Sequence, residues 1–521
     1  MYNVIIFTDI TDNIFGTPAL GAYKCAHVLR KQGYSCLVVN HYSEFTQDDF
    51  KDLIDLAVSD QTILVGFSTT FIKNNQVTRQ RGKYTPPYLD ITENTVFPQG
   101  KDFENEFFAY LHTKNSSVKA VVGGVKVTQQ YPNRNIDYVC LGYSETSIVN
   151  LANHLTTGDT LNNSTKNIYG RVIIDDRFAS KYDFSNEDMI WEETDVVGHK
   201  TLPIEIGRGC IFKCKFCSYP LNGKQNLDFV KTTGLLEQEL RNNYQQHGVT
   251  QYMIVDDTFN DHVEKLEAIR RVVDRLDFQP VFWGYHRLDL LCTRPETVQI
   301  LHDIGVRSMY FGIETLNERT GRIIGKGYNR SRQIEMIERI RNQYPDISMN
   351  GSFIVGLPEE SMDSVRQTYS NLIDRSIPLH SWIFHGMGIY NNNKATFDSD
   401  ITKNFEEYGY IDTGTSQDAI LRNWKNSYTN SDEVKSMALE FNNESRKLST
   451  FMFPGHDALD VSTYGLDFDT MRSTAWNQID FGAIEHDVRP AFVTAYKEKL
   501  LALIGKWHTT AMVRRYPKFD S

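Results

Sequence analysis

Over the first 155 residues, short runs of hydrophobic residues alternate with segments that have helical periodicity. The runs are apolar throughout, which is the pattern of strands buried on both faces of a parallel sheet. The segments between them carry apolar residues three or four positions apart, as amphipathic helices do. This alternation predicts a doubly wound, Rossmann-like α/β domain over residues 1–155. The predicted strands are Asn3–Asp9, Ser35–Asn40, Thr62–Gly66, Val118–Val122 and Tyr138–Leu141.

The same alternation restarts after residues 156–200, a polar and irregular stretch that is predicted to be a linker. Six strand-like runs, each followed by a helical segment, predict a partial (β/α)6 barrel over residues 201–395. In such a barrel the chemistry takes place at the carboxyl ends of the strands, in the loops that follow them. From residue 396 to 521 the rhythm is lost. Helical patterns there, including Gln417–Ser427, predict a helical C-terminal cap.

Composition narrows the class of protein. The chain has 521 residues, 40% of them hydrophobic and 23% charged, so it resembles neither a disordered nor a fibrous protein. No apolar run approaches the roughly 18 residues of a membrane span, and the N-terminus does not have the pattern of a signal peptide. A cytoplasmic protein without a membrane partner is therefore expected. The net charge of −11 argues against a general nucleic-acid binder, which needs a basic surface.

Three of the seven cysteines form a C-x3-C-x2-C motif directly after the first predicted barrel strand: Cys210, Cys214 and Cys217. Three thiolates on one short loop can hold three irons of a [4Fe–4S] cluster and leave the fourth iron open to another ligand. A structural zinc site normally takes four protein ligands, and no further Cys or His stands at a finger-like spacing. A zinc loop or a set of packed thiols is the alternative.

The cysteine motif, with Phe216 before its last cysteine, resembles the cluster motif of the radical S-adenosylmethionine (SAM) enzymes. In that family the open iron chelates the amino and carboxylate groups of SAM. One electron from the cluster cleaves SAM into methionine and a 5′-deoxyadenosyl radical, which abstracts hydrogen from a substrate. The resemblance implies the barrel fold, a [4Fe–4S] cluster, SAM as cosubstrate and a small-molecule or biosynthetic-intermediate substrate. It also implies a reducing partner such as flavodoxin or ferredoxin.

Polar residues at the carboxyl ends of the next three predicted strands match the family's SAM site. Asp256 and Asp257 end the second strand, where the family places polar groups for the methionine ammonium. A helix N-cap is the alternative role for these two aspartates. Arg287 ends the third strand and could pair with the substrate or the methionine carboxylate. Glu314 ends the fourth, near the expected ribose and methionine, where a carboxylate is costly to bury without partners.

The fifth strand resembles the G-x-I-x-G-x-x-E segment that packs on the adenine of SAM, with Ser352 in place of the first glycine. It places Ile354 and Gly356 beside the adenine. The SAM site that the resemblance implies thus consists of Asp256, Asp257, Arg287, Glu314, Ile354 and Gly356.

The N-terminal domain resembles the cobalamin-binding-type domain that precedes this core in one subgroup of the family. Residues 66–70 and 121–124 match two of its loops. The D-x-H-x-x-G motif, which supplies an axial histidine to cobalt, is absent after Asp9. Cobalamin bound without a protein ligand to cobalt and a domain that has lost the cofactor therefore both stay open. The residues at the expected cobalamin site are Ser68, Gly123 and Gly124.

The sequence therefore predicts a radical SAM enzyme, in which hydrogen abstraction leads to cobalamin-dependent methylation, cyclisation or rearrangement. One alternative is a methylthiotransferase-like enzyme, which would need a second cluster on N-terminal loop cysteines. Here Cys25, Cys36 and Cys140 fall in predicted helices and strands. The other alternative is a non-catalytic iron–sulfur or zinc protein. Substrate specificity is expected from residues 396–521 and from the polar insertion Ile72–Lys101.

Overall fold

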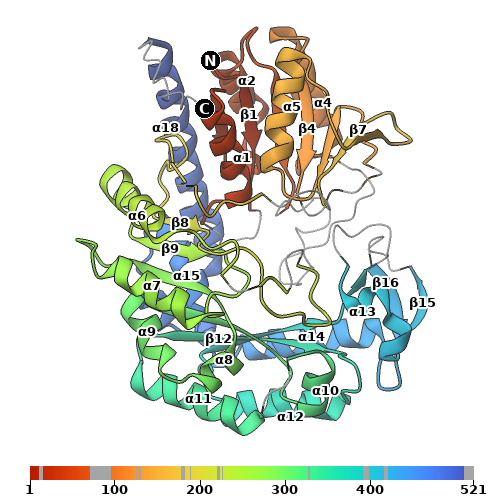
Figure 1. Ribbon diagram of the computed structural model, residues 1–521, viewed down its shortest axis with the longest axis vertical. Coiled ribbons are helices and arrows are strands. Elements are labelled where there is room, and N and C mark those ends of the chain that lie inside the picture. Colours follow the sequence, from red (N-terminus) through yellow and green to blue (C-terminus); the bar gives the residue numbers. More distant parts are fainter. Residues whose placement is uncertain are drawn as a thin grey trace.

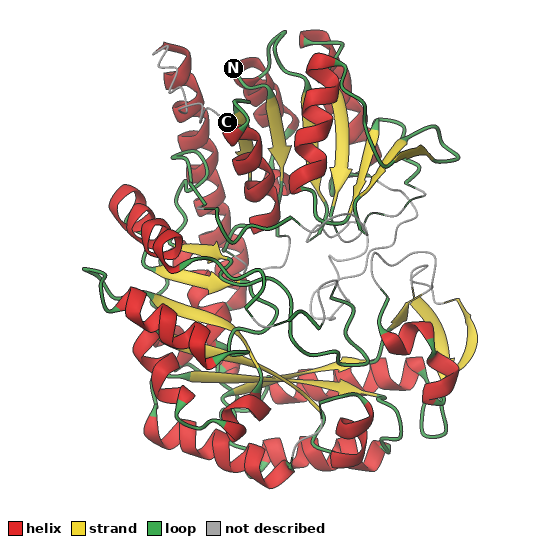
Figure 2. Ribbon diagram, viewed as in Figure 1, coloured by secondary structure: helices red, strands yellow, loops and turns green. Residues whose placement is uncertain are grey.

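The computed structural model divides the chain into an N-terminal sheet domain, a partial barrel and a C-terminal region that contacts both (Figure 1). In Figure 2 the arrowheads of the N-terminal strands point toward the barrel. Among the described residues, no helix is both long and apolar enough to cross a membrane. The structure describes residues 1–10, 16–70, 95–124, 127, 129, 131–177, 182–187, 189–219, 223–225, 227–326, 329–390, 398–415 and 421–509. Most of the predicted polar insertion, residues 72–94, lies outside this part of the chain.

The N-terminal domain is built on a seven-stranded sheet in the order β2-β1-β3-β4-β5-β7-β6. The five predicted strands are parallel, and they are β1 (Val4–Phe7), β2 (Cys36–Val39), β3 (Leu64–Ser68), β4 (Lys119–Gly123) and β5 (Tyr138–Leu141). Two helices pack on each face, because the apolar side chains of these strands are buried on both sides. The pairs are α1 (Leu20–Lys31) with α5 (Glu145–Thr157), and α2 (Gln47–Ala57) with α4 (Lys101–Lys114). The doubly wound fold is confirmed.

Two strands of this sheet lie in the segment that the sequence predicts to be a linker. They are β6 (Ser164–Lys166) and β7 (Val172–Asp175), and β7 pairs parallel with β5. All three residues of β6 are exposed and polar, so the hydrophobic pattern gives no sign of a strand there. The N-terminal sheet therefore extends beyond residue 155, to Asp175.

The barrel is an open sheet of six parallel strands in sequential order, with β8 and β13 at its edges. The strands are β8 (Thr201–Ile204), β9 (Gln251–Ile254), β10 (Val281–His286), β11 (Val306–Glu314), β12 (Ser348–Val355) and β13 (Ser381–Gly386). The helices between them are α6 (Thr233–His247), α7 (Val263–Val273), α8 (Leu288–Thr293), α9 (Thr297–Ile304), α10 (Glu318–Ile323), α11 (Arg330–Gln343) and α12 (Met362–Ile373). This order confirms the predicted partial (β/α)6 barrel.

The C-terminal region is mostly helical, as predicted, but it also contains two strands of a small antiparallel sheet. The predicted helix Gln417–Ser427 is wrong, because residues 421–425 form a strand that pairs with residues 411–415. The strands are β14 (Ile389–Tyr390), β15 (Ile411–Thr415) and β16 (Leu421–Lys425). The helices are α13 (Asp400–Lys403), α14 (Ser431–Ser445), α15 (Gly455–Val461), α16 (Phe468–Arg472), α17 (Phe481–Ala483) and α18 (Arg489–Thr509).

The last helix, α18, runs back along the N-terminal domain (Figure 1). Its buried side chains, among them Tyr496 and Leu500, belong to the same apolar core as α2 and α4. Lys497 forms an ion pair of 2.7 Å with Asp49 of α2. The two ends of the chain thus stabilise one domain.

We expect Leu500→Ala to lower the free energy of unfolding by about 2–5 kcal/mol, because it leaves a cavity in the core beneath α18. Urea unfolding followed by circular dichroism measures this loss. Glu498→Ala, at an exposed position of the same helix, is the control and should change the free energy by less than about 0.5 kcal/mol. Equal effects of the two substitutions would contradict the packing described here.

Candidate functional site

The cysteine loop, residues 207–219, follows β8 at the carboxyl end of the barrel sheet, and Asp256 fixes the chain that enters it. Asp256 Oδ1 accepts hydrogen bonds of 2.8 Å from the backbone N–H groups of Ile206 and Gly207. Its Oδ2 lies 3.4 Å from Nζ of Lys265. A Cβ on Gly207 would come within 3.0 Å of Oδ2, so glycine gives the carboxylate room. The structure gives Asp256 a positioning role, and its contact with SAM stays a prediction.

The three cysteines of the motif lie on this one loop, and none forms a disulfide. Sγ of Cys210 is 3.3 Å from Oγ1 of Thr258, and Sγ of Cys214 is 3.2 Å from Nη1 of Arg287. Within the described residues, no three His, Cys, Asp or Glu side chains are arranged around a single metal ion. A set of three thiolates fits a cubane cluster with one open iron, whereas structural zinc takes four protein ligands.

Arg287 is held against the cysteine loop from several sides. Its guanidinium stacks on the ring of Phe212 at 3.7 Å and donates to Asp289 at 3.0 Å. The Asn260 side chain bonds to both the backbone N–H and the carbonyl of Arg287. The structure places Arg287 on Cys214, and its predicted pairing with the substrate or SAM stays a prediction. A cation and hydrogen-bond donor at a ligating sulfur stabilises the charge of an iron–sulfur cluster.

Glu314 ends β11 in a conformation that glycine usually adopts. Its φ is 66°, and the pairing of β11 with β12 shifts register between Gly312 and Glu314. Such a bulge re-aims a side chain, and here the carboxylate lies 3.2 Å from Nζ of Lys326. A Cβ on Gly312 would come within 2.6 Å of that carboxylate. Backbone strain of this kind persists only where the surrounding structure holds it, and it is common at functional sites. The strain therefore supports a role for Glu314 in the site.

The other predicted SAM residues have mixed surroundings. Asp257 is half-buried beside the cysteine loop; burial and the neighbouring Asp256 raise its pKa to about 6. Ile354 is half-buried near the end of β12. Gly356 has a φ of 92° and lies against the C-terminal region, where an added Cβ would come within 2.8 Å of Trp424. The close packing explains why glycine stands there, and contact with adenine stays a prediction.

The predicted cobalamin residues meet at the carboxyl edge of the N-terminal sheet. Ser68 and Gly123 are paired neighbours at the ends of β3 and β4. The carbonyl of Gly123 accepts two hydrogen bonds of 3.0 Å from Thr69, one from its N–H and one from its hydroxyl. Gly124 has a φ of 108°, and a Cβ there would lie 2.7 Å from Oγ1 of Thr70. The structure brings these residues together, and their contact with a ligand stays a prediction.

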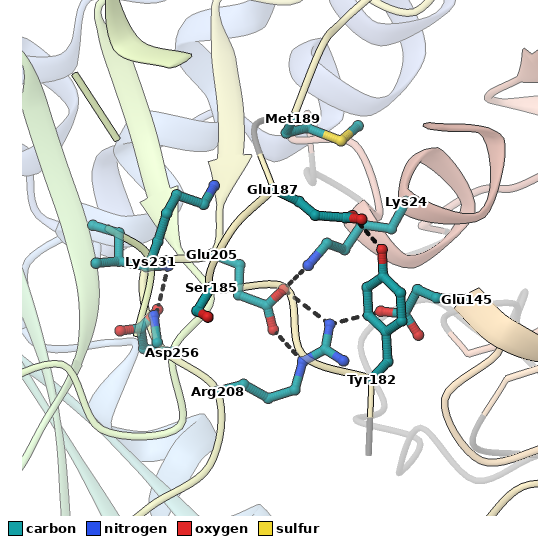
Figure 3. A network of polar contacts seen from close by, with 12 residues as sticks. Lys24, Glu145, Tyr182, Ser185, Glu187, Met189, Glu205, Arg208, Lys231 and Asp256 are labelled. Carbon is teal, nitrogen blue, oxygen red and sulfur yellow. Dashed lines mark hydrogen bonds and ion pairs between the residues drawn. The ribbon is translucent and has the colours of Figure 1, made fainter. Parts of the chain in front are cut away.

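A buried ion network, centred on Arg208, joins the N-terminal domain to the cysteine loop (Figure 3). Arg208 donates at 2.7 Å to Glu145 of α5 and at 2.7 Å to Glu205. Lys24 of α1 pairs with Oε2 of Glu205, which also accepts a hydrogen bond of 3.0 Å from Arg208. Burial alone would raise the pKa of Glu205, but the positive charges of Lys24 and Arg208 bring this pKa down to about 2. The sequence pattern missed this network, because its members come from segments far apart in the chain.

Residues 204–372 match the family model of the Radical SAM superfamily. This part of the chain is a radical SAM domain. The radical SAM domain begins in β8, contains all three cysteines of the motif and ends in α12, so it includes each predicted SAM residue.

Two curated relatives match part of the chain. An uncharacterized methyltransferase from Pyrococcus horikoshii is 25% identical over 161 residues, which are 31% of this chain and 34% of that protein. A tRNA-2-methylthio-N(6)-dimethylallyladenosine synthase from Dehalococcoides mccartyi is 25% identical over 179 residues, 33% of this chain and 42% of that protein. The chain thus spans less than half the length of either relative.

Solved structures of two enzymes, TsrM and OxsB, have the fold of nearly the whole chain. One is the radical SAM methyltransferase TsrM from Kitasatospora setae, with cobalamin and a [4Fe–4S] cluster bound. It superposes with a TM-score of 0.56 at 13% identity, over 97% of this chain and 100% of TsrM. Another TsrM structure holds tryptophan as substrate. The cobalamin-dependent enzyme OxsB, with aqua-cobalamin and SAM bound, has a TM-score of 0.60 at 14% identity, over 99% of this chain and 82% of OxsB. These likenesses show a shared fold.

We expect Arg208→Met to lower the free energy of unfolding by about 3–5 kcal/mol, because it leaves the buried carboxylate of Glu145 without a cation and Glu205 with Lys24 alone. Urea unfolding measures the effect. Arg366→Met is the matched control: Arg366 is 60% exposed and 3.8 Å from its partner, so its loss should change the free energy by less than about 1 kcal/mol. An Arg208 variant as stable as the control would show that the network does not tie the two domains together.

Proposed function

We propose that this protein is a cobalamin-dependent radical SAM enzyme acting on a small molecule. The observation that carries the proposal is the three-thiol loop at the carboxyl end of the barrel sheet, within the radical SAM domain. When bound, a reduced [4Fe–4S] cluster supplies the electron that cleaves SAM to methionine and a 5′-deoxyadenosyl radical, which abstracts hydrogen from the substrate. Cys210, Cys214 and Cys217 would hold three of its irons.

The chain's own side chains prepare this site before any cofactor binds. Asp256 holds the entry of the cysteine loop, and Arg287 neutralises charge at Cys214. Glu314 and Asp257, both at the carboxyl ends of barrel strands, would bind the polar groups of SAM. The adjacent C-terminal region covers the end of β12 through Trp424 and so helps to keep water from the radical.

Cobalamin would bind at the carboxyl edge of the N-terminal sheet, through Ser68, Gly123 and Gly124. When bound it supplies a centre for methyl transfer or redox chemistry. The tight approach of Thr70 to Gly124 gives this edge the close backbone packing of a cofactor loop. Cobalamin in both TsrM and OxsB, which have this fold, supports the same assignment here. The Pyrococcus horikoshii methyltransferase and TsrM favour methylation as the reaction.

The methylthiotransferase alternative has less support from the structure. Such an enzyme would use three more cysteines on N-terminal loops for a second cluster. Here Cys25 lies in α1, Cys36 in β2 and Cys140 in β5, and the last two are buried. Burial raises the pKa of the Cys36 and Cys140 thiols to about 12, so they would stay protonated rather than bind iron. We further propose that a flavodoxin- or ferredoxin-like protein supplies the electron, and that the enzyme works in the cytoplasm.

Anaerobic reconstitution with iron and sulfide tests the proposal. With dithionite and SAM, the unaltered protein should form 5′-deoxyadenosine, detected by mass spectrometry. Cys214→Ala removes one cluster ligand, so product should fall to background. The control is Cys292→Ala, a half-buried cysteine of α8 outside the loop, which should keep the product. One bound zinc instead of a cluster, or product from the Cys214 variant, would contradict the proposal.

A further inference from the structure

A helix of the C-terminal region, α15, packs on the inner face of the barrel sheet. Ser308 and Ser348, near the amino ends of β11 and β12, face it: a Cβ on Gly455 would come within 2.9 Å of Oγ of Ser308 and 2.5 Å of Cβ of Ser348. On β8, Oγ1 of Thr201 donates to the carbonyl of Leu459 at 2.9 Å. The helix therefore closes the amino end of the barrel, opposite the cysteine loop.

Four aromatic side chains meet between α15 and the cysteine loop. The ring of His456 lies 5.3 Å from that of Trp283 and 5.2 Å from that of Tyr310. Tyr285 lies 5.1 Å from Tyr310 and 5.8 Å from Trp283. Although Tyr285 belongs to a central barrel strand, its side chain is 37% exposed, and it interacts electrostatically with Tyr219 of the cysteine loop. The aromatic group thus extends from α15 toward the cysteine loop.

Several buried polar atoms around these rings have no hydrogen-bond partner among the described residues. They are Nε1 of Trp283, Oγ of Ser308, Oγ of Ser348, Oδ1 of Asn350, Nδ1 of His456 and Oδ2 of Asp460. Trp283, Asn350 and Asp460 are 1%, 3% and 0% exposed. Native proteins rarely leave such atoms unpaired, and a bound ligand is one way to satisfy them. The acceptors among them, Oδ1 of Asn350 and Oδ2 of Asp460, would pair with a hydrogen-bond donor of a bound ligand.

Two carboxyl groups of α15, those of Asp457 and Asp460, act on this face. His456 and Asp460 are four residues apart, so they lie on the same side of α15. One oxygen of Asp460 accepts a hydrogen bond from the Thr17 hydroxyl, while burial raises the pKa of its carboxyl well above the usual value. Desolvation of its hydroxyl, with smaller contributions from Asp460 and Asp457, raises the pKa of Tyr285 to about 12. A cation bound on this face would lower the pKa values of both Asp460 and Tyr285. The faces of aromatic rings attract cations as well.

We propose that Trp283, Tyr285, Tyr310, His456 and Asp460 bind a cationic amine of the substrate. The proposal rests on the function proposed above and adds a substrate class to it: a molecule whose ammonium group lies against α15 while its reacting carbon points toward the cysteine loop. The C-terminal region would then set specificity through α15, which reaches the interior of the barrel.

Two probes of the same shape and different charge test this. Choline carries a quaternary ammonium, and 3,3-dimethylbutan-1-ol is its neutral carbon analogue. By calorimetry on the reconstituted full chain, choline should bind about tenfold more tightly than the neutral analogue. Asp460→Asn keeps the acceptor for Thr17 and removes the charge, so it should weaken choline about tenfold and leave the neutral analogue unchanged. The control is Asp363→Asn, because the side chain of Asp363 on α12 is 98% exposed. This variant should bind choline as tightly as the unaltered chain does.

Equal binding of the two probes, or no binding of either, would overturn the amine proposal without any variant having to fold. Unchanged choline affinity in a folded Asp460→Asn protein would also overturn it. Formation of 5′-deoxyadenosine by the same samples separates the two proposals. If the unaltered protein cleaves SAM but does not prefer choline, only the substrate class is wrong; if it does not cleave SAM, the proposed function fails.

Discussion

Buried charged side chains hold the cysteine loop, which has no regular secondary structure, in place at the centre of the molecule's candidate site. The cysteine loop has few ladder hydrogen bonds of its own, so its backbone and thiols need partners from elsewhere. Asp256 supplies them at the entry of the loop, Arg287 at its centre, and Arg208 links it to the N-terminal domain. Each of these charges is itself paired, because an unpaired charge at this depth would be very costly. The backbone at the entry of the loop and the surroundings of Cys214 are therefore fixed by the chain's own side chains.

The N-terminal sheet and the barrel meet at the cysteine loop. The N-terminal strands direct their carboxyl ends toward the barrel (Figure 2). The cysteine loop follows the carboxyl end of β8, the first barrel strand. The C-terminal region contacts both partners, since α18 packs on α2 and α15 packs on β10 and β11. A radical formed at the loop would thus lie between two preformed surfaces, and TsrM and OxsB have the same overall fold.

Local patterns were sufficient to predict much of this. Buried parallel strands have short apolar runs, so the parallel strands of both sheets could be predicted from the sequence. The placement of Cys210, Cys214 and Cys217 on one loop after β8 is likewise a property of a few adjacent residues. Features that depend on contacts between distant segments could not be predicted from the sequence. Glu145 and Arg208 meet only when two domains pack, and β16 is a strand because β15 lies beside it. The polar strand β6 and the position of α15 inside the barrel likewise have no local sequence signal.

The central claim is that three thiolates hold a [4Fe–4S] cluster whose fourth iron is open to SAM. Mössbauer spectroscopy of the protein reconstituted with ⁵⁷Fe tests it most directly, because it distinguishes individual irons. The account predicts a cubane cluster in which one of the irons changes its isomer shift when SAM is added and the others do not. A cluster whose irons all stay unchanged with SAM, or a protein that takes up no cluster, would contradict it.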